Sequence, residues 1–382
     1  MRSVPLLISA GEASGDMYAA RLAAALQQRA NVALFGMGGP QMQSAGVDVV
    51  TDYREVSVVG ITEILSHLPS LVRAMRRLVF EASVRHPPFA ILTDFPGFHL
   101  RLARKLRPHR VRNIYYICPQ FWAWRPWRVR VIRRRFALAL CIFPFEQQFF
   151  SDAGVPTQFI GHPLVGQVQA TQSREEFCRQ HQLDPQLPVI TVLPGSRHAE
   201  LAQHMPGLRE ASAIIYHQRP AQFVVAAAAR ANLAELQSGW STSLTVRVVE
   251  NQTYNAVAAA DAAIVSSGTA TIEAALLNAP MVVVYRVTPL TALLAKPLVR
   301  TKFFSMVNLI AERPVVPELI QNDFTPQNVA KEILHLLNDS PARAEMRIGL
   351  AEVRRRLGPP GAVDRAAAAI AALLEGNVVA GL

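Results

Sequence analysis

A short turn in the second half of the chain carries residue types that bind phosphate. It follows the apolar run Val189–Leu193 and reads PGSRHAE at residues 194–200. Amide N–H groups at a helix start and the fork of an arginine both bind phosphate oxygens, although an ordinary strand-to-helix turn explains the same residues. We take Ser196 as the N-cap, which puts Glu200 one residue beyond the capping-box position. The candidate ligand-binding residues are Gly195, Ser196, Arg197 and Glu200.

A second glycine-containing turn, SSGTATIE at residues 266–273, follows another apolar run and leads into a helix. Two such turns in one domain can hold both phosphates of a diphosphate, while a carboxylate accepts the two hydroxyls of a ribose. The pair therefore predicts a nucleotide-diphosphate site more specifically than either turn alone. The candidate residues are Ser267, Gly268, Thr269, Thr271 and Glu273.

An acidic residue in the first half, Asp94, directly follows an apolar strand predicted at 90–93. Open parallel sheets bind ligands at the carboxyl ends of their strands. A carboxylate beside Phe95 and Phe98 loses hydration, which raises its pKa and suits it to act as a general base. A helix-capping role for Asp94 is the competing interpretation.

Two further loops of the first half combine residues that contact ligands. AGEASGD at 10–16 joins a strand predicted at 5–9 to a helix that extends through Gln28, but it lacks the GxGxxG pattern of dinucleotide-binding turns. Residues 122–128 hold three tryptophans and two arginines, which can stack on sugar or base rings or lie at a membrane interface.

Strand and helix patterns alternate along the chain, which predicts an α/β fold with parallel, doubly wound sheets. The 382 residues are too many for one typical domain, and the uncharged stretch before Ser173 reads as a connector. We expect domains at 1–165 and 166–340, followed by helices at 341–382. The additional strands are predicted at 31–36, 113–117, 138–143, 223–228, 244–249, 261–265 and 281–285.

The net charge of +11 is unevenly placed, because nearly all of the excess Lys and Arg lies before residue 171. A one-sided basic domain favours an anionic partner, either nucleic acid or a phospholipid membrane. A basic solvated surface without any partner is the simpler alternative.

Apolar residues recur at helical spacing between Ile61 and Val79, and Pro69 starts a second helical segment. Two helices packed on the sheet explain this stripe. Its basic flank also fits an amphipathic patch that rests on an anionic membrane. The candidate patch comprises Ile61, Ile64, Leu65, Leu68, Leu71, Val72 and Met75, together with Arg73, Arg76 and Arg77.

Several absences in the sequence bear on the compartment. No apolar run reaches the roughly 18 residues of a membrane-spanning helix. Glu12 and Asp16 interrupt any secretory signal pattern near the N-terminus. Cys118, Cys141 and Cys178 are few, odd in number and without CxxC spacing, which disfavours disulfides and cysteine-held metals and fits a reducing environment. We therefore expect a cytoplasmic protein.

Eight motifs, in the same order, resemble those of lipid-A-disaccharide synthase, a family of GT-B glycosyltransferases (family 19). They span nearly the whole chain, so the resemblance is far more specific than any one motif. It rests on AGEASGD at 10–16, GMGGPQM at 36–42, DFPGF at 94–98, WAWR at 122–125, FIGHP at 159–163, LPGSRHAE at 193–200, SSGTATIE at 266–273 and NLIAERPVVPELIQ at 308–321.

The resemblance implies two Rossmann-like domains facing across a cleft, with C-terminal helices packing back or exchanged in a homodimer. It implies a reaction between UDP-2,3-diacylglucosamine and 2,3-diacylglucosamine 1-phosphate (lipid X). The products are a β-1,6-linked lipid A disaccharide 1-phosphate and UDP. This step belongs to lipopolysaccharide synthesis for the Gram-negative outer membrane. No cofactor or metal is implied. Because both substrates carry acyl chains, the family implies a peripheral protein on the anionic inner face of the inner membrane.

Inverting transfer needs a base for the acceptor's 6-hydroxyl and a group that stabilises the departing diphosphate. We assign these roles to Asp94 and Arg197. The resemblance further implies that Glu273 holds the ribose and that Asn308 and Glu312 complete the donor site, in a partner chain if segments are exchanged. The residues expected on the acceptor side are Glu12, Ser14, Gly15, Asp16, Trp122 and Arg125.

One position departs from the family pattern. Some members carry a second Asp three residues after the one matching Asp94, where this chain has Gly97. If that second Asp is the base in those enzymes, Asp94, Glu12 or Asp16 must substitute for it here.

Two other classes of function compete with this assignment. A transferase or epimerase acting on a non-acylated UDP-sugar needs neither the 61–79 stripe nor the tryptophan cluster. A nucleic-acid-binding protein explains the charge but not the two phosphate turns, so we expect no nucleic-acid partner.

Overall fold

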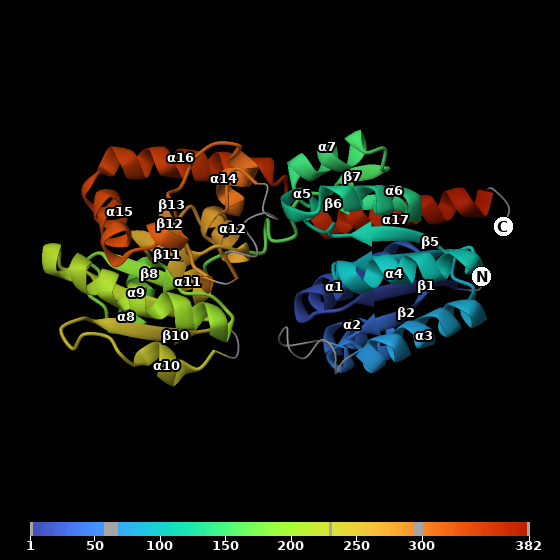
Figure 1. Ribbon diagram of the computed structural model, residues 1–382, viewed down its shortest axis with the longest axis horizontal. Coiled ribbons are helices and arrows are strands. Elements are labelled where there is room, and N and C mark those ends of the chain that lie inside the picture. The colour runs from blue at the N-terminus through green and yellow to red at the C-terminus, as the bar shows by residue number, and fades with distance from the viewer. Residues whose placement is uncertain (1–2, 57–67, 229–230, 290, 293–300, 380–382) are drawn as a thin grey trace. The chain divides into compact units, whose positions relative to one another are not determined.

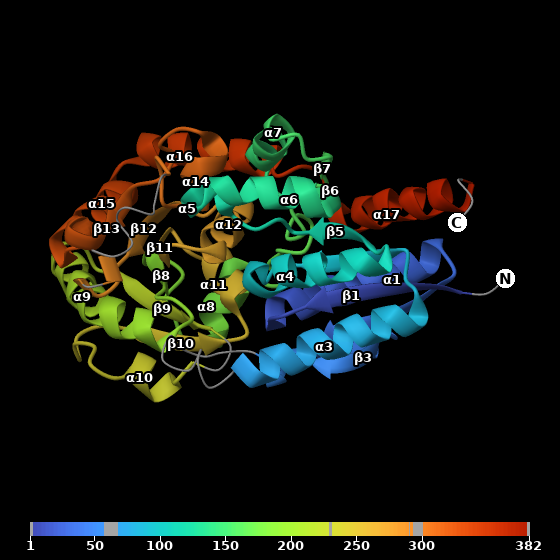
Figure 2. The ribbon, with the colours of Figure 1, turned by 45° about the vertical axis from the view of Figure 1, so that its right-hand side comes forward.

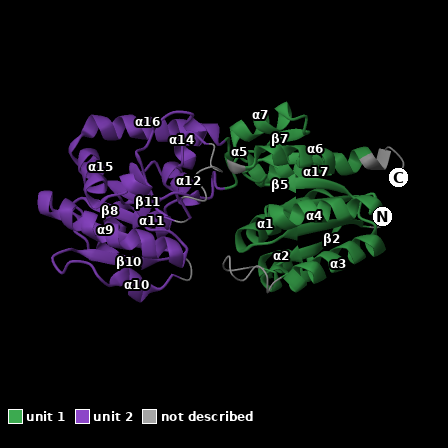
Figure 3. Cartoon of the chain, viewed as in Figure 1, with its two compact units in different colours: residues 1–163, 358–382 green, residues 164–357 purple. Residues whose placement is uncertain are grey.

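The computed structural model describes residues 3–56, 68–228, 231–289, 291–292 and 301–379. The chain divides into two compact units, the first formed by residues 1–163 with 358–382 and the second by residues 164–357 (Figure 3). Residues 341–357, which we grouped with the C-terminal helices, therefore belong to the second unit, while the last helix joins the first.

The first unit is built on a seven-stranded parallel sheet with the order β3-β2-β1-β4-β5-β6-β7 (Figure 1). The order reverses between β1 and β4, so the loops that follow these two neighbouring strands diverge and leave room for a ligand. The strands are β1 (Val4–Ala10), β2 (Val32–Gly38), β3 (Asp48–Asp52), β4 (Phe89–Thr93), β5 (Arg112–Tyr116), β6 (Phe136–Cys141) and β7 (Thr157–Phe159).

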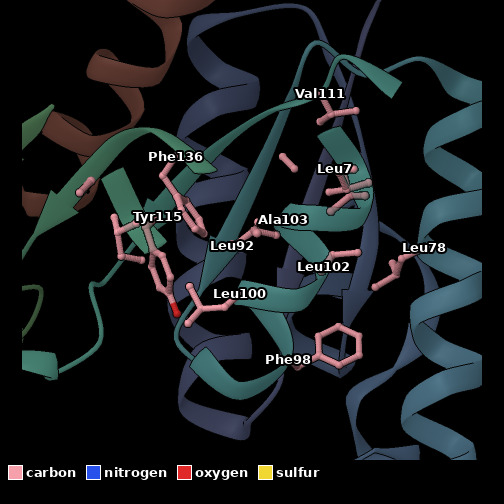
Figure 4. Close-up of a cluster of buried hydrophobic side chains, with 14 of the residues drawn as sticks. Leu7, Leu78, Leu92, Phe98, Leu100, Leu102, Ala103, Val111, Tyr115 and Phe136 are labelled. Carbon is pink, nitrogen blue, oxygen red and sulfur yellow. The ribbon is translucent and has the colours of Figure 1, made fainter. Parts of the chain in front are cut away.

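Three helices, α3, α4 and α6, cover one face of this sheet, and Figure 2 shows them in front of the strands. Buried leucines and aromatic rings fill the space between these helices and the strands (Figure 4). The last helix of the chain, α17, packs along the first, α1. The described helices of this unit are α1 (Ala13–Arg29), α2 (Pro40–Ser44), α3 (Leu68–Arg85), α4 (Pro96–Leu106), α5 (Phe121–Trp124), α6 (Val129–Arg135), α7 (Pro144–Asp152) and α17 (Ala362–Val379).

The second unit has a six-stranded parallel sheet with the order β10-β9-β8-β11-β12-β13. Its order reverses between β8 and β11, and the two predicted phosphate turns are the loops that follow these neighbouring strands. The strands are β8 (Val189–Leu193), β9 (Gln222–Ala227), β10 (Val246–Glu250), β11 (Ala262–Ser266), β12 (Met281–Tyr285) and β13 (Glu318–Ile320).

Among the described helices of the second unit, α8 precedes the first strand, and the others lie between the strands or after the last one. Two of them, α9 and α12, begin at the phosphate turns and so point their amino ends at any ligand bound there. The described helices are α8 (Arg174–Gln180), α9 (His198–Gln218), α10 (Leu233–Gln237), α11 (Thr253–Ala258), α12 (Thr269–Leu276), α14 (Met306–Ala311), α15 (Pro326–Asn338) and α16 (Ser340–Arg356).

Candidate active site

Asp94 lies where β4 ends, in a backbone conformation that costs free energy. Its φ is 50° and that of Phe95 is 45°, both in the left-handed region that non-glycine residues rarely adopt. The Phe95 ring covers Gly11 so closely that a Cβ built on Gly11 would lie 2.2 Å from it. The loops after β1 and β4 therefore pack directly together at the switch point of the sheet.

A buried polar network holds the strained backbone of Asp94. The Asp94 carbonyl oxygen accepts hydrogen bonds from His99 Nδ1 at 2.7 Å and from the Tyr115 hydroxyl at 2.9 Å. His99 Nε2 in turn lies 2.8 Å from the Ser9 hydroxyl. Burial lowers the pKa of His99 to about 4, so the ring is neutral. Because a carbonyl can only accept, the proton sits on Nδ1, and Nε2 accepts from Ser9.

The three residues of this network were not predicted from the sequence. Ser9, His99 and Tyr115 are all fully buried, and they come from β1, α4 and β5. The only sign of this network in the sequence is a polar residue within each otherwise apolar segment. Ser9 and His99 are 90 residues apart in the sequence. A sequence pattern does not reveal that such residues share one carbonyl.

The Asp94 side chain has the electrostatics of a general base. Burial raises its pKa to about 6, and the negative charge of Glu12 contributes in the same direction. This is the direction predicted from the sequence, for the predicted reason. At neutral pH the carboxylate is ionised but holds a proton far more readily than an ordinary aspartate does.

The predicted acceptor-side residues of the first loop divide into two groups. Glu12 and Ser14 are exposed at the start of α1, where a ligand can reach them. Gly15 is buried against β1, where a Cβ would lie 3.3 Å from the Ala10 side chain. Asp16 is also buried, and its carboxylate accepts three backbone N–H groups at the start of α2. These donors are Gly39 at 2.7 Å, Gln41 at 3.1 Å and Met42 at 3.2 Å.

This arrangement gives Asp16 a structural task, since its oxygens are already used to hold α2. Glu12 has no such bond: as N-cap residue of α1 it makes no side-chain capping contact. Asp94, one of the three carboxylates considered as bases, combines a raised pKa with a position at the switch point.

Trp122 is anchored within the first unit by a carboxyl group that sequence reasoning missed. Its indole N–H donates to Glu146 at 3.1 Å, and its ring meets Phe145 edge-on at 4.8 Å. Glu146 is fully buried in the first turn of α7, and burial raises its pKa to about 8. The predicted neighbour of Trp122, Arg125, is partly exposed. Trp122 is thus held in one orientation by its buried partner.

The first phosphate turn is closed by its own glutamate. Glu200 Oε2 accepts from the backbone N–H of Ser196 at 3.1 Å and of Arg197 at 3.3 Å, and Oε1 lies 3.3 Å from Arg197 Nη1. The prediction of Ser196 as N-cap was wrong. The helix begins at His198 with Arg197 as its N-cap, so Glu200 occupies the capping-box position and reaches back to the turn. A carboxylate therefore lies where a phosphate would accept the same N–H groups.

Gly195 makes this closure possible. Its φ is 119°, and a Cβ on it would lie 2.8 Å from Glu200 Oε2. Any larger residue would push the carboxylate away from the turn and strain the backbone at the same time.

The second phosphate turn is more open. Gly268 has a φ of 150°, which only glycine adopts readily, and both Gly268 and Thr269 are exposed. Ser267 donates from its hydroxyl to the Phe304 carbonyl at 2.9 Å, and Thr271 donates to the Gly268 carbonyl at 2.7 Å. These two bonds fix the turn from both sides and leave the Thr269 N–H at the amino end of α12.

Glu273 lies one turn into α12 and borders a cavity of about 300 Å³. The Tyr254 hydroxyl donates to its carboxylate at 3.1 Å, and burial raises the pKa of Glu273. Sequence reasoning missed the other wall of this cavity, which comes from the loop after β10 and the start of α11. The lining residues are Gln169, Thr171, Asn251, Gln252, Thr253, Tyr254, Asn255 and Glu273.

Asn308 lies in the first turn of α14 and Glu312 is the C-cap residue of that helix, and the two side chains have different surroundings. Asn308 is buried, and its amide oxygen accepts from Val315 N at 2.7 Å while its amide nitrogen donates to the Val316 carbonyl at 2.9 Å. Glu312 is exposed, 3.5 Å from Arg356 Nη1. The structure thus gives Asn308 the task of holding the loop before β13. The role of both residues in a donor site stays a prediction.

Within the described part of the chain, no three His, Cys, Asp or Glu side chains gather in a way that would hold a metal ion. The three cysteines are free and buried. No helix among the described residues is both long and apolar enough to span a bilayer.

Two parallel α/β units, each with a reversal in strand order, are the architecture of the GT-B glycosyltransferases, as predicted. Solved structures agree: MurG of Acinetobacter baumannii has a TM-score of 0.58 at 14% identity, covering 97% of this chain and 99% of its own. A UDP-GlcNAc 2-epimerase from Neisseria meningitidis has a TM-score of 0.60 at 11% identity, covering 98% and 100%. At such identities the likeness establishes the fold alone.

Sequence comparison is more specific. The lipid-A-disaccharide synthetase family model matches residues 6–369. A lipid-A-disaccharide synthase of Solibacter usitatus is 46% identical over 375 residues, which cover 98% of each chain. The chain therefore belongs to the lipid-A-disaccharide synthase family, which confirms the predicted family. It is a glycosyltransferase that forms the lipid A disaccharide, acting on a sugar nucleotide and a lipid-linked acceptor.

Proposed function

We propose that the donor is UDP-2,3-diacylglucosamine and the acceptor is 2,3-diacylglucosamine 1-phosphate. The products are the β-1,6-linked disaccharide 1-phosphate and UDP. The observation that carries this proposal is the pair of helix-starting turns after β8 and β11, with the Glu273 carboxylate and a cavity beside them. These groups suit a uridine diphosphate, and membership of the family supports the choice of acylated sugars as substrates.

The donor diphosphate would bind the amides of the two turns, around Ser196 and Thr269. The Glu200 carboxylate now accepts the N–H groups of Ser196 and Arg197, so it must give them up as the diphosphate arrives. Arg197, whose side chain is 78% exposed, is free to turn from Glu200 to a phosphate oxygen. Glu273 would accept the ribose hydroxyls, and the uracil would enter the cavity next to Tyr254.

Asp94 would remove the proton of the acceptor's 6-hydroxyl. As that oxygen attacks the anomeric carbon from the face opposite to the diphosphate, the new C–O bond forms and the bond to UDP breaks. The electron pair leaves with UDP, whose charge Arg197 and the turn amides stabilise. The proton ends on Asp94, which a pKa of about 6 allows. Turnover requires the Asp94 loop and the donor turns to act on the same pair of substrates.

The direct test is UDP release from UDP-2,3-diacylglucosamine, measured with and without the monosaccharide 1-phosphate. We expect release to depend on the acceptor and to match disaccharide formation one to one. Equal release without the acceptor would indicate hydrolysis, and an epimerised sugar nucleotide would indicate the alternative reaction. Either result contradicts the proposal.

We further propose that the protein is cytoplasmic and binds peripherally to the anionic inner face of the inner membrane, through α3. Of the predicted patch, Ile61, Ile64 and Leu65 lie outside the described residues. Leu71 and Met75 pack against the core, whereas Leu68 is 54% and Val72 42% exposed. Phe80 and Val84 extend the exposed apolar row, and Arg73, Arg76 and Arg77 are exposed beside it.

Vesicle flotation tests this surface. Replacing Val72 and Phe80 with Ser should reduce binding to anionic vesicles without unfolding, because both side chains are exposed. Ile348→Ser is the matched control, since Ile348 is 71% exposed on α16 of the second unit. Unchanged flotation of the double variant would contradict this docking surface.

A further inference from the structure

The second unit has a cavity of about 450 Å³ at the edge of its sheet opposite to the donor turns. Pro188 and Asp261 immediately precede β8 and β11, so the cavity lies at the amino ends of the strands whose carboxyl ends carry the phosphate turns. It is therefore separate from the donor site. Its remaining walls come from α8, the loop before β8, and the ends of α9, α11 and α15, together with the first turns of α16.

Four arginines line this cavity, against one carboxylate. The carboxylate of Asp261 lies 2.9 Å from Arg174 Nη2, so these two charges compensate each other. The guanidinium of Arg174 also donates to the carbonyl oxygen of Leu187 at 3.1 Å. The Arg174–Asp261 pair is thus part of the wall. The remaining lining arginines are Arg219, Arg343 and Arg347.

Neutral groups hold two of these three arginines in place. Arg219 Nη1 donates to the Leu337 carbonyl at 2.7 Å and to the Asn338 amide oxygen, and Arg343 Nη2 donates to the Ser340 hydroxyl at 3.3 Å. Arg347 is exposed one turn further along α16. Such partners orient a guanidinium without cancelling its charge, so among the described residues three positive charges line one hollow uncompensated.

We propose that this cavity is a second anion site, which binds a phosphate group. Guanidinium forks match phosphate oxygens, and three of them around one hollow favour an anion of two or more negative charges. The volume exceeds what a phosphate ion fills, so the phosphate belongs to a small phosphorylated compound or to a phospholipid headgroup. Neither the glycosyl transfer nor the docking through α3 uses this site.

Binding of inorganic phosphate, measured by calorimetry with saturating UDP present to occupy the donor turns, tests the proposal. The variant Arg343→Gln/Arg347→Gln should bind phosphate at least about tenfold more weakly than the wild type. Arg354→Gln/Arg355→Gln is the matched control, because both arginines are exposed on the same helix and lie outside the cavity. Circular dichroism and UDP affinity should be equal in all three proteins.

Flotation with phosphatidylglycerol vesicles distinguishes the two sources of the phosphate. Loss of vesicle binding in the cavity variant but not in the control, without measurable binding of free phosphate, assigns the site to a lipid headgroup. Loss of free-phosphate binding assigns it to a soluble compound. The proposal is overturned if the cavity variant equals the wild type in both assays, or if the control loses as much as the cavity variant.

Discussion

The proposed mechanism depends on one residue, a carboxylate that is ionised yet basic. Burial and the charge of Glu12 raise the pKa of Asp94 to about 6. Three buried residues from three different elements hold its main chain in a left-handed conformation. These contacts fix the backbone that carries the carboxylate, and the base and its support can be tested separately.

Replacing Asp94 with Asn removes the base and should lower kcat by roughly 10²- to 10⁴-fold. In the wild type, the carboxyl is protonated and inactive below its pKa, so kcat/KM should fall tenfold per pH unit below about 6 and level off above it. Glu12→Gln should move this limb to lower pH, because it removes a charge that raises the pKa. A kcat of Asp94→Asn within about tenfold of wild type would contradict the assignment.

Tyr115→Phe tests the network that positions Asp94. It removes one donor to the Asp94 carbonyl and should cost about 0.5–1.5 kcal/mol of unfolding free energy, with a fall in kcat. Tyr116→Phe is the control, since the Tyr116 hydroxyl is buried on the same strand without a hydrogen-bond partner among the described residues. Denaturant unfolding measures the change in stability of each variant, and steady-state kinetics measures the change in kcat. Equal changes in the two variants would contradict a positioning role for the network.

Among the structural elements, the two phosphate turns depend on backbone conformations that the glycines in the sequence allow but do not by themselves predict. Gly268 has a φ of 150°, and a Cβ built there meets nothing within 4 Å, so the effect of a substitution is conformational and not steric. Gly195 at φ 119° instead has Glu200 against it. The role of both glycines in ligand binding stays a prediction, while the structure shows a different physical reason why each position requires a glycine.

Gly268→Ala should distort the second turn at a cost of about 1–3 kcal/mol and so raise the KM for the donor by roughly tenfold or more. Gly207→Ala is the control in the same unit, because Gly207 lies within α9 and a Cβ there makes ordinary contact with Phe324 at 3.6 Å. The donor KM of both variants, measured by steady-state kinetics, tests this prediction. An unchanged KM for Gly268→Ala would show that the turn does not bind the donor.

The elements also show what the sequence could and could not predict. Periodicity located the central strands, and β8 and β12 agree with the predicted residues because buried parallel strands are continuous apolar runs. The edge strands β7 and β13, of three residues each, lack such a run and were missed. The Asp94 network was missed because its members meet only in the folded sheet.

In the molecule as a whole, the first unit includes a helix, α17, that follows the second unit in the sequence. The helix α17 packs along α1, with an ion pair of 3.4 Å between Arg29 and Asp364 and a hydrogen bond of 2.8 Å from Arg365 to the Ile160 carbonyl. Because α17 packs along α1, the stability of the first unit depends on a helix that is more than 300 residues away from α1 in the sequence. The resemblance to a known family indicated a returning helix but not its partner.

Ile370→Asp should therefore destabilise the first unit by about 3 kcal/mol or more, because it buries an unpaired charge. Ala368→Asp places the same charge on an exposed position of α17 and should have little effect. Calorimetry with and without UDP separates the units, since the ligand should raise only the transition of the second. An equal Tm shift for both variants would contradict the packing of α17.

In the proposed mechanism, Asp94 and the donor turns together perform an inverting transfer. The most direct measurement is the anomeric configuration and linkage of the disaccharide, determined by nuclear magnetic resonance on product made by the purified protein. We expect a β-linkage to the acceptor's 6-oxygen, formed at the same rate as UDP. An α-linked product, or free diacylglucosamine in place of a disaccharide, would contradict it.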